Sequence, residues 1–252
     1  MSIFLTKRPD QRREQIKTPI HHGDFFVLRH LKYFTSTYIP IVIKPGMRVA
    51  DIGCGGQPLR ELIESCEAHY VGIDVTQNNK GTVDILGDIC SIPLASESFD
   101  AIICTEVLEH SWEPLKALQE LSRLLKPSGV ILITTPFAYP IHEEPYDFCR
   151  ITPFFIRYWF PKIGLQEPKI LELGGNELEV LATVWGNIWK PDERTLLLPR
   201  VVLALMRLTM NLAVLGTNPL TKPLLKQSYF LNFGCIAYKE TGNSVELSSK
   251  EQ

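Results

Sequence analysis

Val-Ala-Asp-Ile-Gly-Cys-Gly-Gly-Gln-Pro occupies residues 49–58 and has the pattern of a buried strand that ends in an acid, followed by a glycine turn and the start of a helix. A second apolar run, Tyr70-Val-Gly-Ile-Asp74, also ends in an acid. Two acid-tipped strands joined by a glycine turn and a helix form a half-site for an adenosine group. The turn lets the backbone approach the ligand, and the second acid accepts hydrogen bonds from the ribose hydroxyls.

A dinucleotide site is the first alternative for this half-site. It requires the pattern G-x-G-x-x-G, in which a helix N-terminus holds a pyrophosphate. Gly53 and Gly55 match the first two glycines, but Pro58 stands at the third position. Asp51 precedes the turn, where a carboxylate would repel a pyrophosphate and suit an ammonium group. S-adenosylmethionine carries an ammonium and a sulfonium and has no phosphate, so these residues favour it over NAD.

Further segments follow the glycine loop in a fixed order. They are Tyr70–Asp74, Gly87-Asp88-Ile89, Ser98–His110 and Leu121–Pro136. With them, over about residues 45–175, the chain resembles the class I S-adenosylmethionine-dependent methyltransferases. The resemblance implies an α/β fold with a doubly wound, seven-stranded sheet that is mostly parallel and has one antiparallel strand.

The resemblance also assigns roles to single residues. Those around the cofactor share positions at strand ends and in the turns that follow them. Asp51 would reach the ammonium group, Asp74 the ribose hydroxyls, and Asp88 the adenine amine. The full set implied for S-adenosylmethionine is Asp51, Gly53, Gly55, Asp74, Asp88, Ile89 and Thr105. A turn residue with a purely local role is the alternative for Asp88.

Alternating strand and helix signals along the chain predict a single methyltransferase domain over residues 19–240. Residues 1–18 are expected to form a loose arm and residues 241–252 a disordered tail. The expected strands are 48–52, 69–74, 82–86, 99–105, 130–135, 168–173 and 229–238. The expected helices are 20–40 (ending before Pro40), 58–66, 113–125, 153–160, 177–190 and 196–215. Helices in about 177–216 are expected to form an insertion. The resemblance implies that the helix over 20–40 caps the cofactor.

Composition limits the classes of partner and compartment. The net charge is −2, which lacks the basic footprint of a nucleic-acid enzyme. The six cysteines show no CxxC pair and no framework spacing, as expected of free thiols in a reducing cytosol. The N-terminus lacks the apolar stretch of a signal peptide, so we expect a cytoplasmic protein.

Residues 196–215 form a strongly apolar helix interrupted by Pro199, Arg200, Arg207 and Asn211. The last three are spaced by seven and four residues, so they share one helical face. Such a helix suits packing against a core, a homodimer face or a membrane surface, the last making the protein peripheral to the membrane. The two arginines argue against a membrane-spanning role.

Two histidines follow strands four and five, where ligands of open α/β sheets bind. His142 and His110 are therefore the candidate catalytic bases for a hydroxyl acceptor, with ordinary loop histidines as the alternative. The segment His142–Thr152 is the candidate substrate loop, in which Tyr146, Asp147 and Arg150 could bind a polar ligand. Pairing between Asp147 and Arg150 that braces the loop is the alternative.

Oxygen methylation of a small molecule, or of a glycan- or lipid-linked intermediate, is the function that we expect. No metal is assigned, but an alternative set of metal ligands exists. If Glu106–His110 is helical, Glu106, Glu109 and His110 lie on one turn and His142 could complete a site for Mg, Mn or Zn. Two other functions stay open. One is a metal-assisted RNA 2′-O-methyltransferase, and the other is a partner subunit that binds the cofactor without catalysis.

Overall fold

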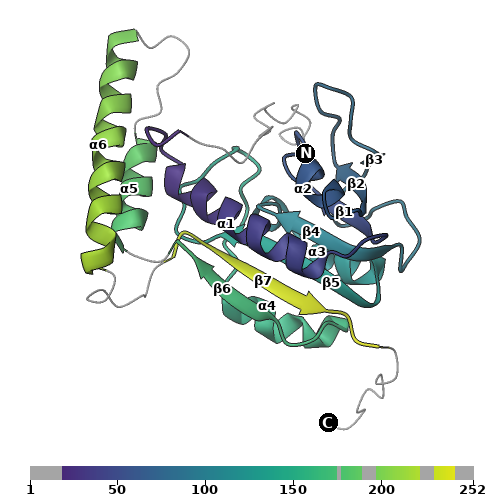
Figure 1. Cartoon of the computed structure of the whole chain (residues 1–252). Coiled ribbons are helices and arrows are strands. Elements are labelled where there is room, and N and C mark those ends of the chain that lie inside the picture. The colour runs from purple at the N-terminus through teal and green to yellow at the C-terminus, as the bar shows by residue number, and fades with distance from the viewer. Residues whose placement is uncertain (1–18, 175–176, 189–196, 222–229, 242–252) are drawn as a thin grey trace.

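The computed structural model describes residues 19–174, 177–188, 197–221 and 230–241 (Figure 1). Its centre is one seven-stranded sheet with the strand order β3-β2-β1-β4-β5-β7-β6. All neighbouring pairs are parallel except those that β7 makes with β5 and β6. The doubly wound, mostly parallel sheet predicted from the sequence is therefore confirmed. Its strands are β1 (Arg48–Ile52), β2 (His69–Asp74), β3 (Ile85–Leu86), β4 (Phe99–Thr105), β5 (Leu125–Pro136), β6 (Lys169–Leu173) and β7 (Asn232–Tyr238).

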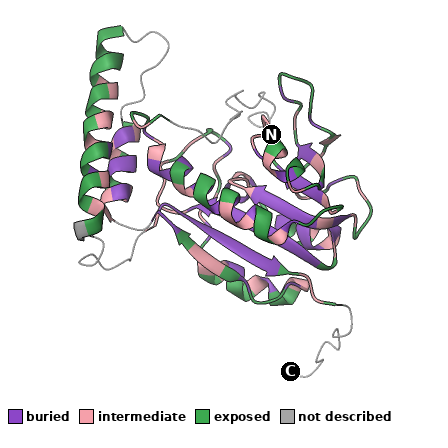
Figure 2. Cartoon of the chain, in the orientation of Figure 1, coloured by how far each residue is buried: buried purple, intermediate pink, exposed green. Residues whose placement is uncertain are grey.

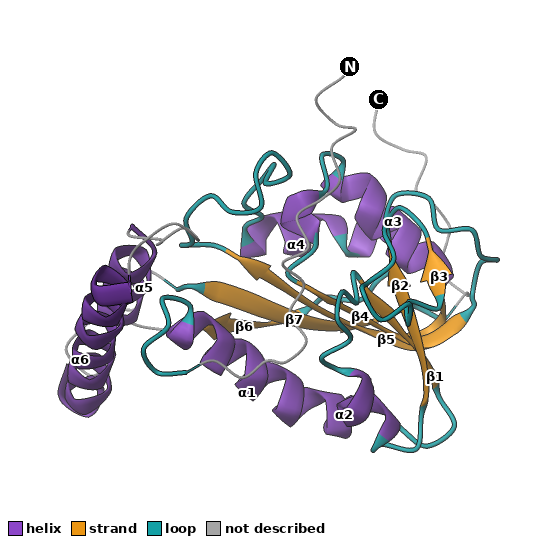
Figure 3. Ribbon diagram, turned by 90° about the horizontal axis from the view of Figure 1, so that it is seen from above, coloured by secondary structure: helices purple, strands orange, loops and turns teal. Residues whose placement is uncertain are grey.

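Helices cover both faces of the sheet (Figure 3). Because side chains alternate along a strand, Ile102 faces one layer and Ile103 the other. The first face packs against α3 (Pro114–Leu124) and α4 (Pro153–Trp159), and the second against α1 (Phe25–Val42) and α2 (Arg60–Glu64). The strands are apolar on both sides for this reason, as parallel strands between helices are.

Several boundaries differ from the sequence prediction: α1 begins at Phe25 and not at residue 20, β3 has only Ile85 and Leu86 of the expected 82–86, and α6 continues beyond residue 215 to Thr221. At two further boundaries the structure shows the physical reason. Pro40 was expected to end the first helix, yet α1 continues to Val42. Proline removes only its own backbone donor, and the buried Ile39 accepts a 2.8 Å hydrogen bond from the amide of Ile43, which is also buried. Burial of these two side chains holds the last turn in place.

The second difference lies between α3 and β5. The helix was expected to end at residue 125 and the strand to begin at residue 130, but β5 begins at Leu125, opposite Phe99 of β4, and its register then shifts. Leu125 and Phe99 are both fully buried, so pairing them extends the strand back to the end of the helix.

The insertion between β6 and β7 consists of α5 (Glu177–Ile188) and α6 (Leu197–Thr221). It lies at one end of the sheet (Figures 1 and 3). Leu173 at the end of β6 pairs with Asn232 at the start of β7, which in turn pairs with Pro136 at the end of β5. The insertion therefore leaves the sheet where the parallel strand β5 has its carboxyl end. The expected loose arm, residues 1–18, and the tail, apart from Thr241, lie outside the described residues.

All six cysteines are free thiols, as predicted. Cys54, Cys104 and Cys235 are buried, and burial raises the pKa of each of these thiols. They act as small apolar side chains in the core.

Candidate active site

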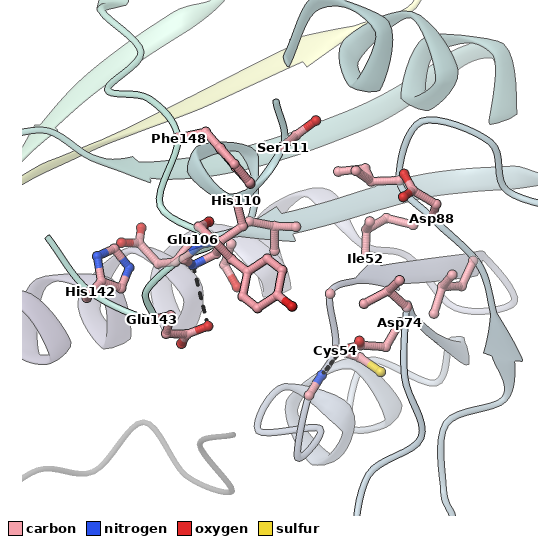
Figure 4. Close-up of a pocket in the computed structure, with 18 of the residues that line it drawn as sticks. Ile52, Cys54, Asp74, Asp88, Glu106, His110, Ser111, His142, Glu143 and Phe148 are labelled. Carbon is pink, nitrogen blue, oxygen red and sulfur yellow. Dashed lines mark hydrogen bonds and ion pairs between the residues drawn. The ribbon is translucent and has the colours of Figure 1, made fainter. Parts of the chain in front are cut away.

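A cavity of about 350 Å³ opens at the carboxyl ends of the parallel strands (Figure 4). This is the edge at which open α/β sheets bind ligands, and the volume lies within the range of small-molecule pockets. The wall combines residues after β1, β2, β4 and β5 with two side chains of α1, Val27 and Leu31. The helix implied to cap the cofactor therefore contributes to the cavity.

The glycine loop forms one side of the cavity. Gly53 has φ +68°, and an added Cβ would lie 2.4 Å from a methyl group of Val107. Only glycine fits this position without a shift of its neighbours. Gly55 also lines the cavity, and its amide donates a 2.9 Å hydrogen bond to Oδ2 of Asp74. The turn thus brings bare backbone to the ligand space and holds the second acid in place.

Two strand-terminal acids have different surroundings. Asp74 lines the cavity, and its Oδ1 accepts a hydrogen bond from the Thr76 amide. Asp51 is 2 % exposed and does not line the cavity. Its Oδ2 accepts a 2.8 Å hydrogen bond from the hydroxyl of Tyr70, a partner that the sequence analysis missed. Burial raises the pKa of Asp51 from 3.8 to about 7, although the Tyr70 hydroxyl acts in the opposite direction.

The other predicted cofactor residues also lie along the cavity. Asp88, Ile89 and Thr105 are all among its lining residues. Asp88 in addition accepts a hydrogen bond from the Cys90 amide through Oδ1, so the local turn considered as an alternative is present. The two roles are compatible because a carboxylate has several acceptor positions.

Several carboxylates line this cavity, together with two imidazoles. Asp74, Asp88, Glu106 and Glu143 contribute to its wall, which contains no Lys or Arg among the described residues. A pyrophosphate would find no cation here, whereas a ligand with an ammonium and a sulfonium would be favoured. The cavity therefore fits S-adenosylmethionine better than a dinucleotide.

His110 follows β4 in the short 3-10 helix η2 (Leu108–His110) and lines the cavity. Its Nδ1 lies 2.8 Å from the carbonyl oxygen of Tyr146. A carbonyl only accepts, so Nδ1 carries the proton and Nε2 of the neutral ring keeps its lone pair. That Nε2 atom lies 3.7 Å from Oε1 of Glu109 and 3.8 Å from Oε2 of Glu143.

His142, in the loop after β5, lines the cavity beside His110, and their ring centroids are 4.9 Å apart. Nε2 of His142 lies 3.9 Å from the same Oε1 of Glu109. Its Nδ1 is 3.1 Å from Asp147 but without the alignment of a hydrogen bond. Burial and the neighbouring His110 lower the pKa of His142, which favours a neutral ring near neutral pH.

Glu109 is fully buried between the two imidazoles. Neither of its carboxylate oxygens has a hydrogen-bond partner among the described residues. Burial, assisted by Glu106, raises its pKa well above the usual value. Ligand atoms of Glu109, His110 and His142 all lie within 4.8 Å of one another, an arrangement that could hold a metal ion.

The fourth residue of the alternative metal set does not join this group. Residues 106–110 are not one α-helical turn, because Glu106 has φ +54° and the helical hydrogen bonding begins only at Leu108. Oε2 of Glu106 instead accepts a hydrogen bond from the side-chain amide of Asn232 in β7. The Glu106 part of the predicted ligand set is therefore wrong, while the other three residues converge.

The candidate substrate loop divides into two parts. Tyr146 is buried and lines the cavity, but Asp147 and Arg150 do not. Arg150 binds Asp147 through both terminal nitrogens and also donates to the carbonyl oxygens of Tyr139 and Pro140. Asp147 accepts a hydrogen bond from the His142 amide. The pair therefore matches the alternative in which Asp147 and Arg150 brace the loop. It positions the catalytic candidates and does not face the cavity.

Several wall residues were missed by the sequence analysis. Glu143 and Phe148 belong to the candidate substrate loop, Tyr139 precedes it, and Trp112 follows η2. Phe148 is tied to the neighbouring segment because its amide donates a 2.9 Å hydrogen bond to the carbonyl oxygen of Glu109. The only sequence signal for these wall residues was the high content of aromatic and acidic residues in 137–151. It did not indicate which of these side chains face the cavity.

Comparison with known proteins agrees with the cavity. A family described as a methyltransferase domain matches residues 50–133. The chain carries a class I S-adenosylmethionine-dependent methyltransferase domain. A solved S-adenosylmethionine-dependent methyltransferase from Archaeoglobus fulgidus is similar in fold, with a TM-score of 0.56 and 19 % identity over 84 % of this chain and 94 % of that one.

Curated relatives match this chain over part of their length. A ubiquinone biosynthesis O-methyltransferase of Dinoroseobacter shibae is 28 % identical over 61 % of this chain and 58 % of that protein. A sterol 24-C-methyltransferase of Gibberella zeae is 32 % identical over 43 % of this chain and 33 % of that protein. The chain thus spans between a third and three-fifths of these relatives. The two relatives methylate at different kinds of atom according to their names.

Proposed function

We propose that this methyltransferase transfers the methyl group of S-adenosylmethionine to a hydroxyl oxygen held beside His110 and His142. The oxygen lone pair forms a bond to the methyl carbon while the carbon–sulfur bond breaks, which leaves the sulfur as a neutral thioether. The hydroxyl proton passes to an imidazole nitrogen. The protein supplies alignment and the base, and the sulfonium supplies the reactivity.

The observation that carries this proposal is the convergence of two imidazoles at the cavity. The Tyr146 carbonyl holds His110 in the tautomer whose Nε2 can accept a proton. Burial favours the neutral, basic form of His142. The named activity of the ubiquinone biosynthesis relative supports oxygen as the acceptor atom, and that of the sterol relative leaves carbon as the alternative. The acceptor itself would be a small molecule or a glycan- or lipid-linked intermediate.

His142→Ala tests the catalytic role. With methyl-labelled S-adenosylmethionine and a panel of phenolic, glycan and lipid-linked alcohols, the wild type should produce a labelled methyl ether that mass spectrometry identifies. We expect the variant to lower turnover by about 10²–10⁴-fold, as loss of a general base does. The dissociation constant of S-adenosylmethionine, measured by calorimetry, should change by no more than about twofold, because His142 lies outside the predicted cofactor residues.

His69→Ala is the matched control, since His69 is exposed at the start of β2 and away from the cavity. Unchanged turnover in His142→Ala would contradict the base role. Cofactor binding by the wild type without transfer to any acceptor class would favour the non-catalytic partner subunit. Labelling on carbon would replace the oxygen proposal with the alternative.

A cation-assisted form of the reaction is favoured by one further observation, the unpartnered oxygens of the buried Glu109. Glu109, His110 and His142 would hold the ion through one carboxylate oxygen and two imidazole nitrogens. A divalent cation there would lower the pKa of a bound hydroxyl and stabilise the developing alkoxide. It would also compensate the buried charge of Glu109, which otherwise has a large desolvation cost.

Glu109→Gln tests the ion site independently of activity. After equilibrium dialysis against Mn²⁺, elemental analysis of the wild type should show about one bound ion per chain. Glu109→Gln should lower the affinity by at least about tenfold, and Glu113→Gln, an exposed neighbour outside the cluster, should leave it unchanged. Wild type without bound Mn²⁺, Mg²⁺ or Zn²⁺ would refute the cation-assisted form and leave the histidine-base proposal intact.

Activity on RNA receives less support. The net charge is −2, and the cavity wall contains acids without a described Lys or Arg. A phosphate backbone requires cations at its binding surface. The charge that would indicate an RNA 2′-O-methyltransferase is therefore missing from the described wall.

A further inference from the structure

The helix α6 has its polar side turned toward the protein. Asn211 is buried, and its side-chain amide donates to the carbonyl oxygen of Ile20. Asn218 donates to Oε1 of Glu179 in α5, and Arg207 interacts electrostatically with Asp24. Arg207 and Asn211, two of the three polar residues predicted to share one helical face, thus make contacts inside the molecule, whereas the third, Arg200, is exposed.

The outward side of α6 is exposed along its length (Figure 2). Exposed positions recur at intervals of three and four residues, so they form one continuous face. An 18-residue window within Leu197–Pro219 has a mean hydropathy of 1.6, and only 11 % of that window is buried. Among its exposed residues, Arg200 alone is charged. The large side chains of this outer face are Leu198, Val201, Val202, Leu205, Met206 and Leu212.

The outer face offers almost no hydrogen bonds to a partner. Thr209, one of its two hydroxyl residues, donates to the carbonyl oxygen of Met206 within its own helix. Thr217 donates in the same way to Ala213. Interfaces between proteins have about one hydrogen bond per 100–200 Å² and a polar rim. Apart from Arg200, the polar side chains of this surface are satisfied within their own helix, which suits hydrocarbon, where no other partner exists.

The neighbouring helix extends this surface. Leu181, Val184 and Ile188 of α5 are exposed and spaced by three and four residues, so they also share one face. The hairpin of α5 and α6 is thus apolar on the outside of both helices. Exposed patches of this kind on monomeric proteins mark sites of protein or membrane interaction.

The inner side of the hairpin reaches the wall of the active site. Val214 and Met210 of α6 pack in one cluster with Val27 and Tyr139. Val27 and Tyr139 in turn line the cavity. The insertion also leaves the sheet at the carboxyl end of β5, the edge at which the cavity opens. Helix α6 and this cluster therefore separate an outer ligand of α6 from the cavity wall.

We propose that the α5–α6 hairpin docks on the surface of a lipid bilayer, with α6 lying in the plane of the membrane and its outer face among the acyl chains. Length and composition would also allow α6 to cross a membrane. An in-plane position is favoured because the polar side of the helix, from Arg207 to Asn218, stays bonded to the folded domain. A second copy of the chain is the alternative occupant, and the scarcity of hydrogen-bonding groups on the outer face argues against it.

Co-sedimentation with phosphatidylcholine vesicles tests the proposal without any methyl acceptor. The purified full chain should bind them, and binding should persist in about 0.5 M NaCl, where attraction between charges is screened. Added phosphatidylglycerol should change binding little, because the outer face carries one charge. The double variant Val202→Asp/Leu205→Asp should lower the bound fraction by about tenfold or more, since it places two charges among the acyl chains.

Phe154→Asp is the matched control, because Phe154 is 80 % exposed but lies on α4. It should bind vesicles like the wild type. Circular dichroism and the affinity for S-adenosylmethionine should be unchanged in both variants. Leu198→Asp, at a position that is 73 % exposed, repeats the test near the start of α6 should the double variant misfold.

Three results would overturn the proposal. The wild type could fail to bind either kind of vesicle, or the α6 variants could bind as well as the wild type. The third result combines two observations: the wild type does not bind vesicles, and it dimerises without lipid in analytical ultracentrifugation unless the α6 substitutions are present. That result would assign the outer face to a second copy of the chain.

Discussion

Asp74 ends β2 and Asp51 is the penultimate residue of the neighbouring parallel strand β1, yet their environments differ in a way that has measurable consequences. Asp74 lies at the cavity and accepts hydrogen bonds from two backbone amides. Asp51 is enclosed, and its carboxylate depends on the hydroxyl of Tyr70. Desolvation therefore dominates at Asp51 and raises its pKa to about 7.

The raised pKa of Asp51 predicts a pH dependence of stability. A carboxyl whose pKa rises from 3.8 to about 7 on folding binds more protons in the folded state between these values. Its stabilising contribution is complete below 3.8 and is lost as pH rises through about 7. The cofactor-free protein should therefore lose free energy of unfolding between about pH 5 and pH 8.5, by roughly 2–4 kcal/mol from this group.

Urea denaturation of Asp51→Asn checks this prediction. The amide keeps an acceptor for Tyr70 but cannot ionise, so the loss of stability with rising pH should be smaller than in the wild type. Asp84→Asn serves as a control, because Asp84 is an exposed carboxylate paired with Arg60. Parallel pH profiles for the wild type and Asp51→Asn would show that the burial of this group is tolerated in its charged form.

At the scale of elements, the docking of α1 on the sheet depends on a glycine in β7. An added Cβ at Gly234 would lie 2.5 Å from the ring of Phe34, which is fully buried on α1. Gly234→Ala should lower the free energy of unfolding by about 1–3 kcal/mol, as overpacking of a core does. The affinity for S-adenosylmethionine should fall with it, because a shift of α1 would displace Val27 and Leu31 in the cavity wall.

Gly216→Ala provides the comparison, since a Cβ there meets nothing within 4 Å. In the middle of α6 this substitution should leave stability unchanged or raise it by up to about 1 kcal/mol. The measurement is urea denaturation of both variants, with calorimetry of cofactor binding. Equal stability of Gly234→Ala and the wild type would show that the Phe34 ring can move at no cost.

The elements themselves were largely predictable, because their signals are local. Apolar runs between turns predict the strands, and Thr152 followed by Pro153 predicts the start of α4, where the Thr152 hydroxyl accepts a hydrogen bond from the Phe155 amide. The boundaries predicted near Pro40 and Leu125 were wrong because burial in the folded protein decides where these elements end. The local sequence there contains only turn and helix-ending signals.

At the scale of the whole molecule, prediction depended on how far apart the partners lie in the chain. The cofactor side follows from an ordered set of motifs, all within residues 49–110, each of which ends a strand at the same edge of the sheet. The contacts of Asp51 with Tyr70, and of Glu106 with Asn232, join residues that no periodicity connects. The second of these removed Glu106 from the ligand set that spacing alone had indicated.

The brace formed by Arg150 and Asp147 also bears on how such an enzyme can diversify. Most of the hydrogen bonds that shape residues 139–150 begin and end inside the segment. Backbone carbonyls tie it to the cofactor half. The carbonyl of Tyr146 binds the His110 ring, the carbonyl of Glu109 accepts from the amides of Phe148 and Cys149, and the carbonyl of Leu108 accepts from the Cys149 thiol. Replacing a side chain leaves the backbone carbonyl of that residue in place. Side chains of this segment can therefore change over evolutionary time, and with them the methyl acceptor that is bound, while the cofactor half of the protein stays the same.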